Sequence, residues 1–279
     1  MLEMGAYECL WAEPAATQKR VSDRLRANPE TLPSALVPED KAQTMAQWVI
    51  DYHRERGVRR FGVRVHRAGE YPWRLRDARH PVEVLQYRGI WELSEGRCVA
   101  IVGTRKPSED GVRRTRKLAT LLARHGFTVV SGLAAGVDTQ AHKAAIEADA
   151  PTIAVIGTPV SDSYPRENAG LQHEIATHHL LISEIPVYRY AQQDWRANRS
   201  WFPQRNATMS ALTEATIIVE ASNTSGTLIQ ARAALYQKRK LFILNSCFER
   251  SDLTWPERFQ RQGAIRVRDL DDILIGLNG

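Results

Sequence analysis

The chain has 279 residues, of which 43% are hydrophobic and 25% are charged, a composition typical of globular proteins. Its 38 lysines and arginines exceed its 32 acidic residues, a mild excess that suits an anionic partner without identifying one. No apolar run is long enough to span a membrane, the N-terminus lacks the apolar core of a secretory signal, and the three cysteines are far apart. These features argue against a membrane, disulfide-stabilised or zinc-binding protein and predict a cytoplasmic one.

Residues 1–64 differ in pattern from the rest of the chain. Two polar stretches, residues 17–28 and 40–57, have helical character, and a proline-containing segment separates them. Apolar side chains recur at helical spacing in the second stretch, so one face of that helix can pack. We therefore predict a small helical appendage over residues 1–64 and a main domain over residues 65–279.

From about residue 98 onward, short apolar runs alternate with helical stretches. The runs cover residues 98–103, 127–132, 152–157, 180–185, 215–221 and 240–245. Because they are apolar on both faces, they predict central strands of a parallel sheet with helices on each side. The helix after the first run should end at Gly126, and the helix after the second should start with Asp138 as its N-cap. The alternation predicts a doubly wound, mostly parallel, extended Rossmann-like α/β sheet.

Glycine-containing turns follow three of these runs, at the edge where ligands bind in doubly wound sheets. The candidate anion-binding residues there are Gly103, Thr104, Arg105, Lys106, Ser131, Gly132, Gly136, Ser225, Gly226 and Thr227. Glycine lets backbone N–H groups approach an oxyanion, and the start of a helix adds partial positive charge. One such turn is most simply a tight turn, whereas three that converge on one edge favour an anion-binding site.

Common catalytic and nucleotide-binding motifs are missing. Neither GxxxxGK[ST] nor a GxGxxG after the first run occurs, which argues against a P-loop ATPase and a standard dinucleotide site. Ser131, Asp138 and His142 suggest a hydrolytic triad, but no GxSxG elbow surrounds the serine, so a helix cap and a packed histidine are the better interpretation. Glu184 and Glu220 follow strands and are expected to order loops. We predict no catalytic residue and no metal ligand.

Residues 188–206 interleave aromatic and cationic side chains and are expected to form a loop. Single-stranded nucleic acid needs both kinds, because its phosphates attract cations and its unstacked bases lie on aromatic faces. We predict that Arg199 and Arg205 contact phosphates and that Trp195, Trp201 and Phe202 are base-stacking candidates. At least one of Trp201 and Phe202 should also anchor the segment to the core. The alternative is that the aromatic side chains only anchor the loop while the arginines are solvated.

Seven motifs follow one another in order from about residue 100, preceded by GEYPWRL…HPVEVLQYRG (69–89). They are VGTRKPSEDG (102–111), SGLAAGVDTQAH (131–142), IAVIGTPVSDSYPREN (153–168), SEIP (183–186), FPQRN (202–206), TIIVEA (216–221) and SGTLIQARAAL (225–235). This set resembles the DprA/Smf family. The resemblance implies a Rossmann-like protein that binds single-stranded DNA, usually as a homodimer, and loads the RecA recombinase during natural transformation. It also implies no established enzymatic activity, and we expect no cofactor.

The resemblance assigns phosphate binding to residues of four of these motifs. They are Gly103, Arg105, Ser131, Gly132, Gly136, Arg205, Asn206, Ser225, Gly226 and Thr227. The sequence departs from the family pattern at two places. Ala207 follows Asn206 where a second arginine is common, and the strand expected to end in Pro-Gly ends instead in Asn245-Ser246.

Two other functions stay open at this point. The same sheet and turns can hold one phosphorylated nucleoside, as in a small-nucleotide sensor or a nucleotide hydrolase. The N-terminal helices could instead recruit a partner protein, alone or in addition to DNA binding. The main prediction is a non-catalytic protein that binds single-stranded DNA and does not contact membranes.

Overall fold

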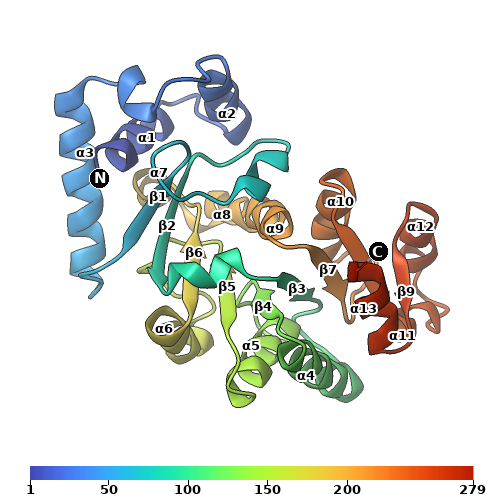
Figure 1. Ribbon diagram of the computed structural model, residues 1–279. Helices are drawn as coiled ribbons and strands as arrows, with labels where there is room; N and C mark the ends of the chain where they lie inside the picture. Colours follow the sequence, from blue (N-terminus) through green and yellow to red (C-terminus); the bar gives the residue numbers. More distant parts are fainter. Residues whose placement is uncertain (279) are drawn as a thin grey trace.

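The computed structural model describes residues 1–278 and contains one nine-stranded sheet (Figure 1). The strands lie in the order β1-β2-β6-β5-β4-β3-β7-β8-β9. Their bounds are β1 Gly62–Val65, β2 Val84–Gly89, β3 Cys98–Val102, β4 Thr128–Ser131, β5 Thr152–Ile156, β6 Leu180–Ser183, β7 Ala215–Ile218, β8 Lys240–Leu244 and β9 Ile265–Val267. In the part of the sheet with the order β6-β5-β4-β3-β7-β8-β9, all neighbouring strands pair in parallel. Strand β2 pairs antiparallel with both β1 and β6.

The six predicted apolar runs are strands β3 to β8, which confirms the mostly parallel α/β fold. Every residue of β3 and β5 is buried, as expected for strands that helices cover on both faces. The sequence pattern missed β1, β2 and β9. Edge strand β1 has four residues, three of them only partly buried, so no continuous apolar run marks it.

Helices cover both faces of the sheet (Figure 1). Val99 and Ile101 of β3 point to the face covered by α4 and α5, whereas Ala100 and Val102 point to the face covered by α9 and α10. The first face carries α4 Glu109–Arg124, α5 Val137–Glu147, α6 Ala169–His178 and α13 Leu270–Asn278, and the second carries α9 Trp201–Leu212, α10 Thr227–Tyr236 and α12 Trp255–Arg261. The short α11, Asn245–Phe248, follows β8.

Local capping explains where α4 and α5 begin and end. The Ser108 hydroxyl accepts a hydrogen bond from the Gly111 N–H at 3.0 Å at the start of α4, and Gly126, with φ +79°, follows its end as predicted. The predicted N-cap role of Asp138 is wrong. Gly136 is the N-cap of α5, and Asp138 lies inside the first turn, where its carboxylate faces the preceding loop.

Three helices precede the sheet: α1 Leu2–Ala12, α2 Gln18–Arg26 and α3 Glu39–Glu55. The helical character of the N-terminal segment is therefore confirmed, although the sequence pattern did not indicate α1. The three helices share one apolar core with side chains of β1, β2, α9 and the segment after β6. The predicted division between residues 1–64 and 65–279 falls within β1 and stays a prediction.

The segment expected to be a loop, residues 188–206, is largely helical. It forms α7 Val187–Gln192, α8 Trp195–Asn198 and the first half of α9. Asp194 caps α8, because its carboxylate accepts the Ala197 N–H at 2.8 Å. This part of the sequence has many aromatic and few small apolar residues, so it does not show the apolar spacing that is typical of a helix.

Short 3-10 helices occupy several connections: η1 Pro33–Leu36, η2 Trp73–Asp77, η3 Trp91–Glu95 and η4 Arg166–Asn168. Within residues 1–278, none of the helices combines the length and the apolar character needed to cross a bilayer.

Candidate nucleic-acid interface

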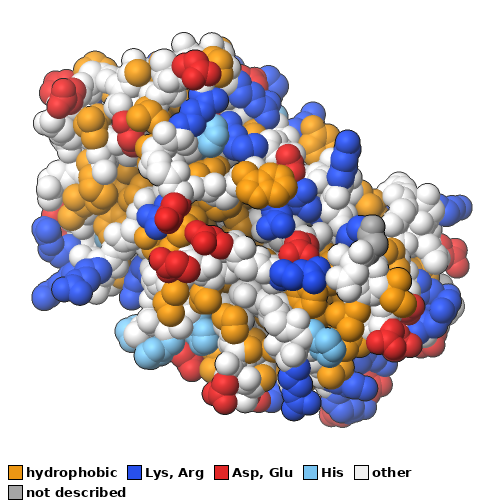
Figure 2. All heavy atoms as spheres, viewed as in Figure 1, with side chains coloured by type: hydrophobic (Ala, Val, Ile, Leu, Met, Phe, Trp, Pro, Cys, Tyr) orange, Lys and Arg blue, Asp and Glu red, His pale blue; other side chains and the backbone are white. Residues whose placement is uncertain are grey.

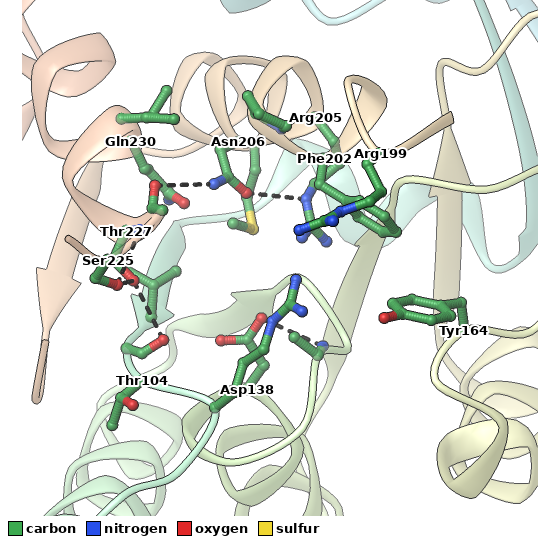
Figure 3. Close-up of a pocket in the computed structure, with 18 of the residues that line it drawn as sticks. Thr104, Asp138, Tyr164, Arg199, Phe202, Arg205, Asn206, Ser225, Thr227 and Gln230 are labelled. Carbon is green, nitrogen blue, oxygen red and sulfur yellow. Dashed lines mark hydrogen bonds between the residues drawn. The ribbon is translucent and has the colours of Figure 1, made fainter. Parts of the chain in front are cut away.

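A cavity of about 630 Å³ lies where the carboxyl ends of the central strands meet the N-terminal parts of α9 and α10 (Figure 3). We call it the edge pocket. Its walls come from the turns after β3 and β4, from Tyr164 after β5, and from α8, α9 and α10. Convergence of the predicted turns at one edge of the sheet is thus a feature of the structure, as the parallel strand order requires.

Most of the predicted site residues line this pocket. They are Gly103, Thr104, Arg105, Trp195, Arg199, Phe202, Arg205, Asn206, Ser225, Gly226 and Thr227. Gly132 instead lines a smaller adjoining cavity of about 90 Å³, which also touches Arg105 and Arg205. Lys106, Ser131, Gly136 and Trp201 line neither cavity.

Free positive charge comes from Arg105 and Arg199, which line the pocket, and from Lys106, which follows Arg105 in the same turn. All three side chains are exposed, and none forms an ion pair with an acid in the described part of the chain. On the face drawn in Figure 2, lysines and arginines are interspersed with acids rather than gathered in one patch. Unpaired cations beside a cavity therefore locate the candidate anion site better than the overall charge does.

Three aromatic side chains form one wall of the pocket, which we call the aromatic wall. The ring centre of Tyr164 lies 4.8 Å from that of Trp195 and 5.2 Å from that of Phe202. Trp195 is 47% exposed, so part of its ring is free to stack on a planar ligand. The Arg105 guanidinium lies 5.9 Å from the Phe202 ring centre, which places cation and aromatic face side by side.

The turn after β4 supports the pocket rather than presenting free donors. The Ser131 side chain is fully buried and donates to the Ile101 carbonyl at 2.7 Å. The Gly132 N–H donates to the Asp138 carboxylate at 3.1 Å, as does the Ala134 N–H at 3.4 Å. Direct phosphate contacts by Ser131 and the Gly132 N–H were therefore predicted wrongly, because protein acceptors already occupy both donors.

Gly136 is needed for backbone geometry. Its φ is +81°, and a Cβ there would lie 2.5 Å from the Thr104 carbonyl oxygen. The Thr104 carbonyl in turn accepts the Val137 N–H at 3.1 Å. Gly136 thus brings the turn after β4 against the turn after β3, and does not line the pocket.

Arg205 is the floor of the pocket and not a free guanidinium fork. It is 4% exposed, donates through Nη1 to the carbonyls of Gly132 and Val155, and donates through Nε to Asn206 at 3.0 Å. Burial lowers the pKa of Arg205, and burial raises the pKa of neighbouring Asp138. Of the three guanidinium nitrogens only Nη2 lacks an acceptor within residues 1–278, so the predicted phosphate contact of Arg205 is limited to that nitrogen.

Trp201 is not a base-stacking residue. It is 4% exposed, and its ring centre lies 5.3 Å from that of Trp11 in the N-terminal core. The expectation that one of Trp201 and Phe202 anchors the segment is confirmed. Successive residues of α9 point in different directions, so Phe202 faces the pocket while Trp201 faces away from it.

The Ser-Gly-Thr turn at the start of α10 is hydrogen-bonded both to the turn after β3 and to α9. The Thr227 hydroxyl donates to the Gly103 carbonyl at 3.2 Å and accepts from the Ser225 hydroxyl at 3.0 Å. Asn206 reaches the same turn by donating to the Gly226 carbonyl at 3.4 Å (Figure 3). The backbone N–H groups of Arg105 and Gly226 find no protein acceptor in the described chain, and both residues line the pocket.

Sequence reasoning missed Tyr164, Met209 and Gln230, which also line the pocket. The pairing of Tyr164 with the following proline after a buried strand was the available signal for the first. Met209 and Gln230 are buried on helices, and their place follows only from how α9 and α10 pack.

The hydrolytic interpretation has no geometric support. His142 is fully buried, its Nδ1 lies 2.7 Å from the Thr152 hydroxyl, and burial lowers the pKa of His142 to about 3. The Glu220 carboxylate accepts from the Ser108 hydroxyl at 2.8 Å and so orders the turn before α4. Residues 1–278 contain no cluster of three metal-ligating side chains.

Comparison with known families gives a match over most of the chain. The family model for DNA recombination-mediator protein A matches residues 62–278. The chain belongs to this family. The predicted DprA/Smf resemblance is thereby confirmed, and the match covers the whole sheet while starting after α1 to α3.

Relatives of the DprA/Smf family are similar in sequence to this chain over most of its length. The DNA processing protein DprA of Bacillus subtilis is 35% identical over 226 residues, which cover 81% of this chain and 73% of the relative. The protein Smf of Synechocystis sp. is 39% identical over 179 residues, which cover 63% of this chain and 44% of the relative. The chain therefore spans less than half of that second protein.

Two solved DprA structures have the same architecture. The crystal structure of DprA from Streptococcus pneumoniae matches with a TM-score of 0.70 and 26% identity, over 99% of this chain and 93% of that one. The structure of DNA processing protein A from Helicobacter pylori, described for its single-stranded DNA binding mode, matches with a TM-score of 0.66 and 26% identity, over 78% and 95% of the two chains.

Proposed function

We propose that the edge pocket binds single-stranded DNA and that this chain does so without catalysing a reaction on it. One observation carries the proposal: two arginines without ion pairs, Arg105 and Arg199, and an aromatic wall line a single cavity at the carboxyl edge of the sheet, and the exposed Lys106 follows Arg105 in the same turn. Single strands present the matching features, phosphates and unstacked bases, at alternating positions along one chain. The Helicobacter pylori relative with a described single-stranded DNA binding mode supports the same assignment.

The residues in and beside the pocket would make different kinds of contact with the DNA. Arg105, Lys106 and Arg199 would neutralise phosphates, and the free backbone N–H groups at Arg105 and Gly226 would add neutral donors. Trp195 would stack on a base, with Tyr164 and Phe202 holding its ring in place.

The proposal of a non-catalytic role rests on the acids near the pocket. The Asp138 carboxylate accepts two backbone N–H groups, and the Glu220 carboxylate accepts from Ser108. Both are occupied in shaping turns, so neither is placed to take a proton from a bound ligand. By the family resemblance we also propose that the protein acts as a homodimer in the cytoplasm and passes DNA to the RecA recombinase.

The test is fluorescence anisotropy with a length series of labelled oligodeoxythymidines at several salt concentrations. We expect affinity to rise with length and fall with salt, and Arg105→Ala or Arg199→Ala to reduce the slope of log affinity against log salt by about 0.7 each. Arg124→Ala is the matched control, because Arg124 is an exposed arginine at the far end of α4.

Two results would overturn the proposal. One is an affinity for the oligonucleotides that does not change with salt concentration, or that falls as much in Arg124→Ala as it does in Arg105→Ala. The other is binding of single nucleotides as tight as binding of the longest oligonucleotide, which would establish the small-nucleotide sensor instead.

A further inference from the structure

The aromatic wall is built by two segments that have a second face away from the pocket. The turn after β5 carries Tyr164, and residues 187–206 carry Trp195 and Phe202. The second face of both segments lies against the N-terminal helices. Within residues 1–278, the pocket lining itself includes nothing before Val102.

Helix α1 fixes the start of the second segment through Glu8. This side chain is 2% exposed, and its two carboxylate oxygens accept the Val187 N–H at 2.8 Å and the Tyr188 N–H at 3.0 Å. Glu8 thus satisfies the first donors of α7 from outside that helix. Helices as short as α7 and α8 are not stable alone, so their positions depend on such contacts.

Two further contacts hold the same segment on α1. The Arg189 guanidinium donates to the carbonyls of Trp11 and Glu13, each at 3.2 Å. Trp201 packs edge to face on Trp11. The stretch that bears Trp195 is therefore attached to α1 on both sides, at Arg189 and at Trp201.

Helix α3 fixes the other segment two residues before Tyr164. The Tyr52 hydroxyl donates to the Asp162 carboxylate at 2.9 Å, and His53 Nδ1 lies 2.9 Å from the Ser161 hydroxyl. His53 Nε2 lies 2.7 Å from the Gln86 side-chain oxygen on β2, which orients the ring. The helix that packs most closely on α1 therefore holds the second half of the aromatic wall.

We propose that the N-terminal helices are a positioning unit for the aromatic wall, with Glu8 and Tyr52 as the positioning residues. The proposal rests on the edge pocket being the DNA site, and adds that residues outside it set its affinity. A change in how α1 and α3 pack would move Tyr164 relative to Trp195, and DNA that orders this wall would in turn favour one packing of the helices.

The experiment compares Glu8→Ala with Glu3→Ala. Glu3 is a matched control on the same helix, because its carboxylate accepts the Ser34 N–H at 2.9 Å and the Ser34 hydroxyl at 2.5 Å within the N-terminal helices. We expect Glu8→Ala to weaken oligodeoxythymidine binding by about tenfold, the equivalent of one lost helix cap, and Glu3→Ala to change it by less than about twofold. The Glu8→Ala effect should vanish in a Trp195→Ala background, because both changes act on one element.

Amide hydrogen exchange provides a readout that does not depend on DNA. Glu8→Ala should accelerate exchange selectively in residues 187–200, and Tyr52→Phe should do so around Tyr164. If the wild-type chain does not bind the oligonucleotides, the proposed function fails while exchange still decides the positioning role.

Three outcomes would overturn the positioning role. They are equal losses of affinity in Glu8→Ala and Glu3→Ala, a full Glu8→Ala effect without Trp195, and unchanged exchange in residues 187–200. Should Glu8→Ala fail to fold, Glu8→Gln keeps one acceptor oxygen, and Tyr52→Phe keeps the ring, so both carry the same expectations at smaller magnitude.

Discussion

Replacing Arg205 by alanine should lower the stability of the folded protein and not only weaken ligand binding. The buried guanidinium donates to the carbonyls of Gly132 and Val155 and to Asn206. A hydrogen bond from a charged group contributes about 1.5–3 kcal/mol, and the substitution leaves two buried carbonyls without this donor. After allowing for the cost of burying the charge in the wild type, we expect the free energy of unfolding to fall by about 3–5 kcal/mol.

Arg105→Ala is the matched comparison, because Arg105 lines the same pocket but is exposed and without an ion pair among the described residues. Its unfolding free energy should stay within about 0.5 kcal/mol of the wild type, while its salt slope for DNA falls. Urea denaturation followed by tryptophan fluorescence measures the first quantity and anisotropy the second. A urea midpoint for Arg205→Ala equal to that of the wild type would refute the structural role assigned to this arginine.

Four further substitutions separate folding from binding. Burial raises the pKa of Glu184 to about 7, so the folded chain keeps a proton that the unfolded chain releases above about pH 4.5. Stability should therefore fall as pH rises towards 7, and Glu184→Gln should remove up to about 1.4 kcal/mol per pH unit of that fall in urea titrations. Gly132→Ala should lose about 1–3 kcal/mol of stability, because the new Cβ would lie 2.6 Å from Cζ of Arg205. Trp195→Ala should lose about 1–3 kcal/mol of DNA binding with unchanged unfolding. Trp201→Ala should lose about 3–5 kcal/mol of unfolding free energy in the same denaturation assay.

The central strands could be predicted from the sequence because helices cover both of their faces. Every residue of β3 and β5 is buried, so the apolar run marks the strand without any knowledge of its neighbours. The antiparallel β1 and β2 lie at the border with the N-terminal helices, and only one of the four residues of β1 and three of the six residues of β2 are buried. Their place depends on tertiary packing, which a local pattern does not contain.

The candidate site was predictable at the level of the turns but not of the side chains. Parallel strands bring their carboxyl ends to one edge, so turns distant in sequence had to meet there. Arg199 and Arg205 lie in the same cationic and aromatic segment of the sequence, yet Arg199 is exposed and Arg205 is buried as the floor of the edge pocket. The different directions of Trp201 and Phe202 follow from the 3.6-residue repeat of α9, which the expected loop does not have.

The number of exposed cations sets the salt dependence that the edge pocket should show. Arg205 and Asp138 are buried together, and each charge favours the ionised form of the other, so the pair adds little net charge to the pocket. Arg105, Lys106 and Arg199 remain to neutralise phosphates. At about −0.7 per phosphate on a single strand, the wild-type slope of log affinity against log salt should be about −2. A slope steeper than about −4 in the anisotropy titration would require cations beyond the pocket and contradict binding at this edge alone.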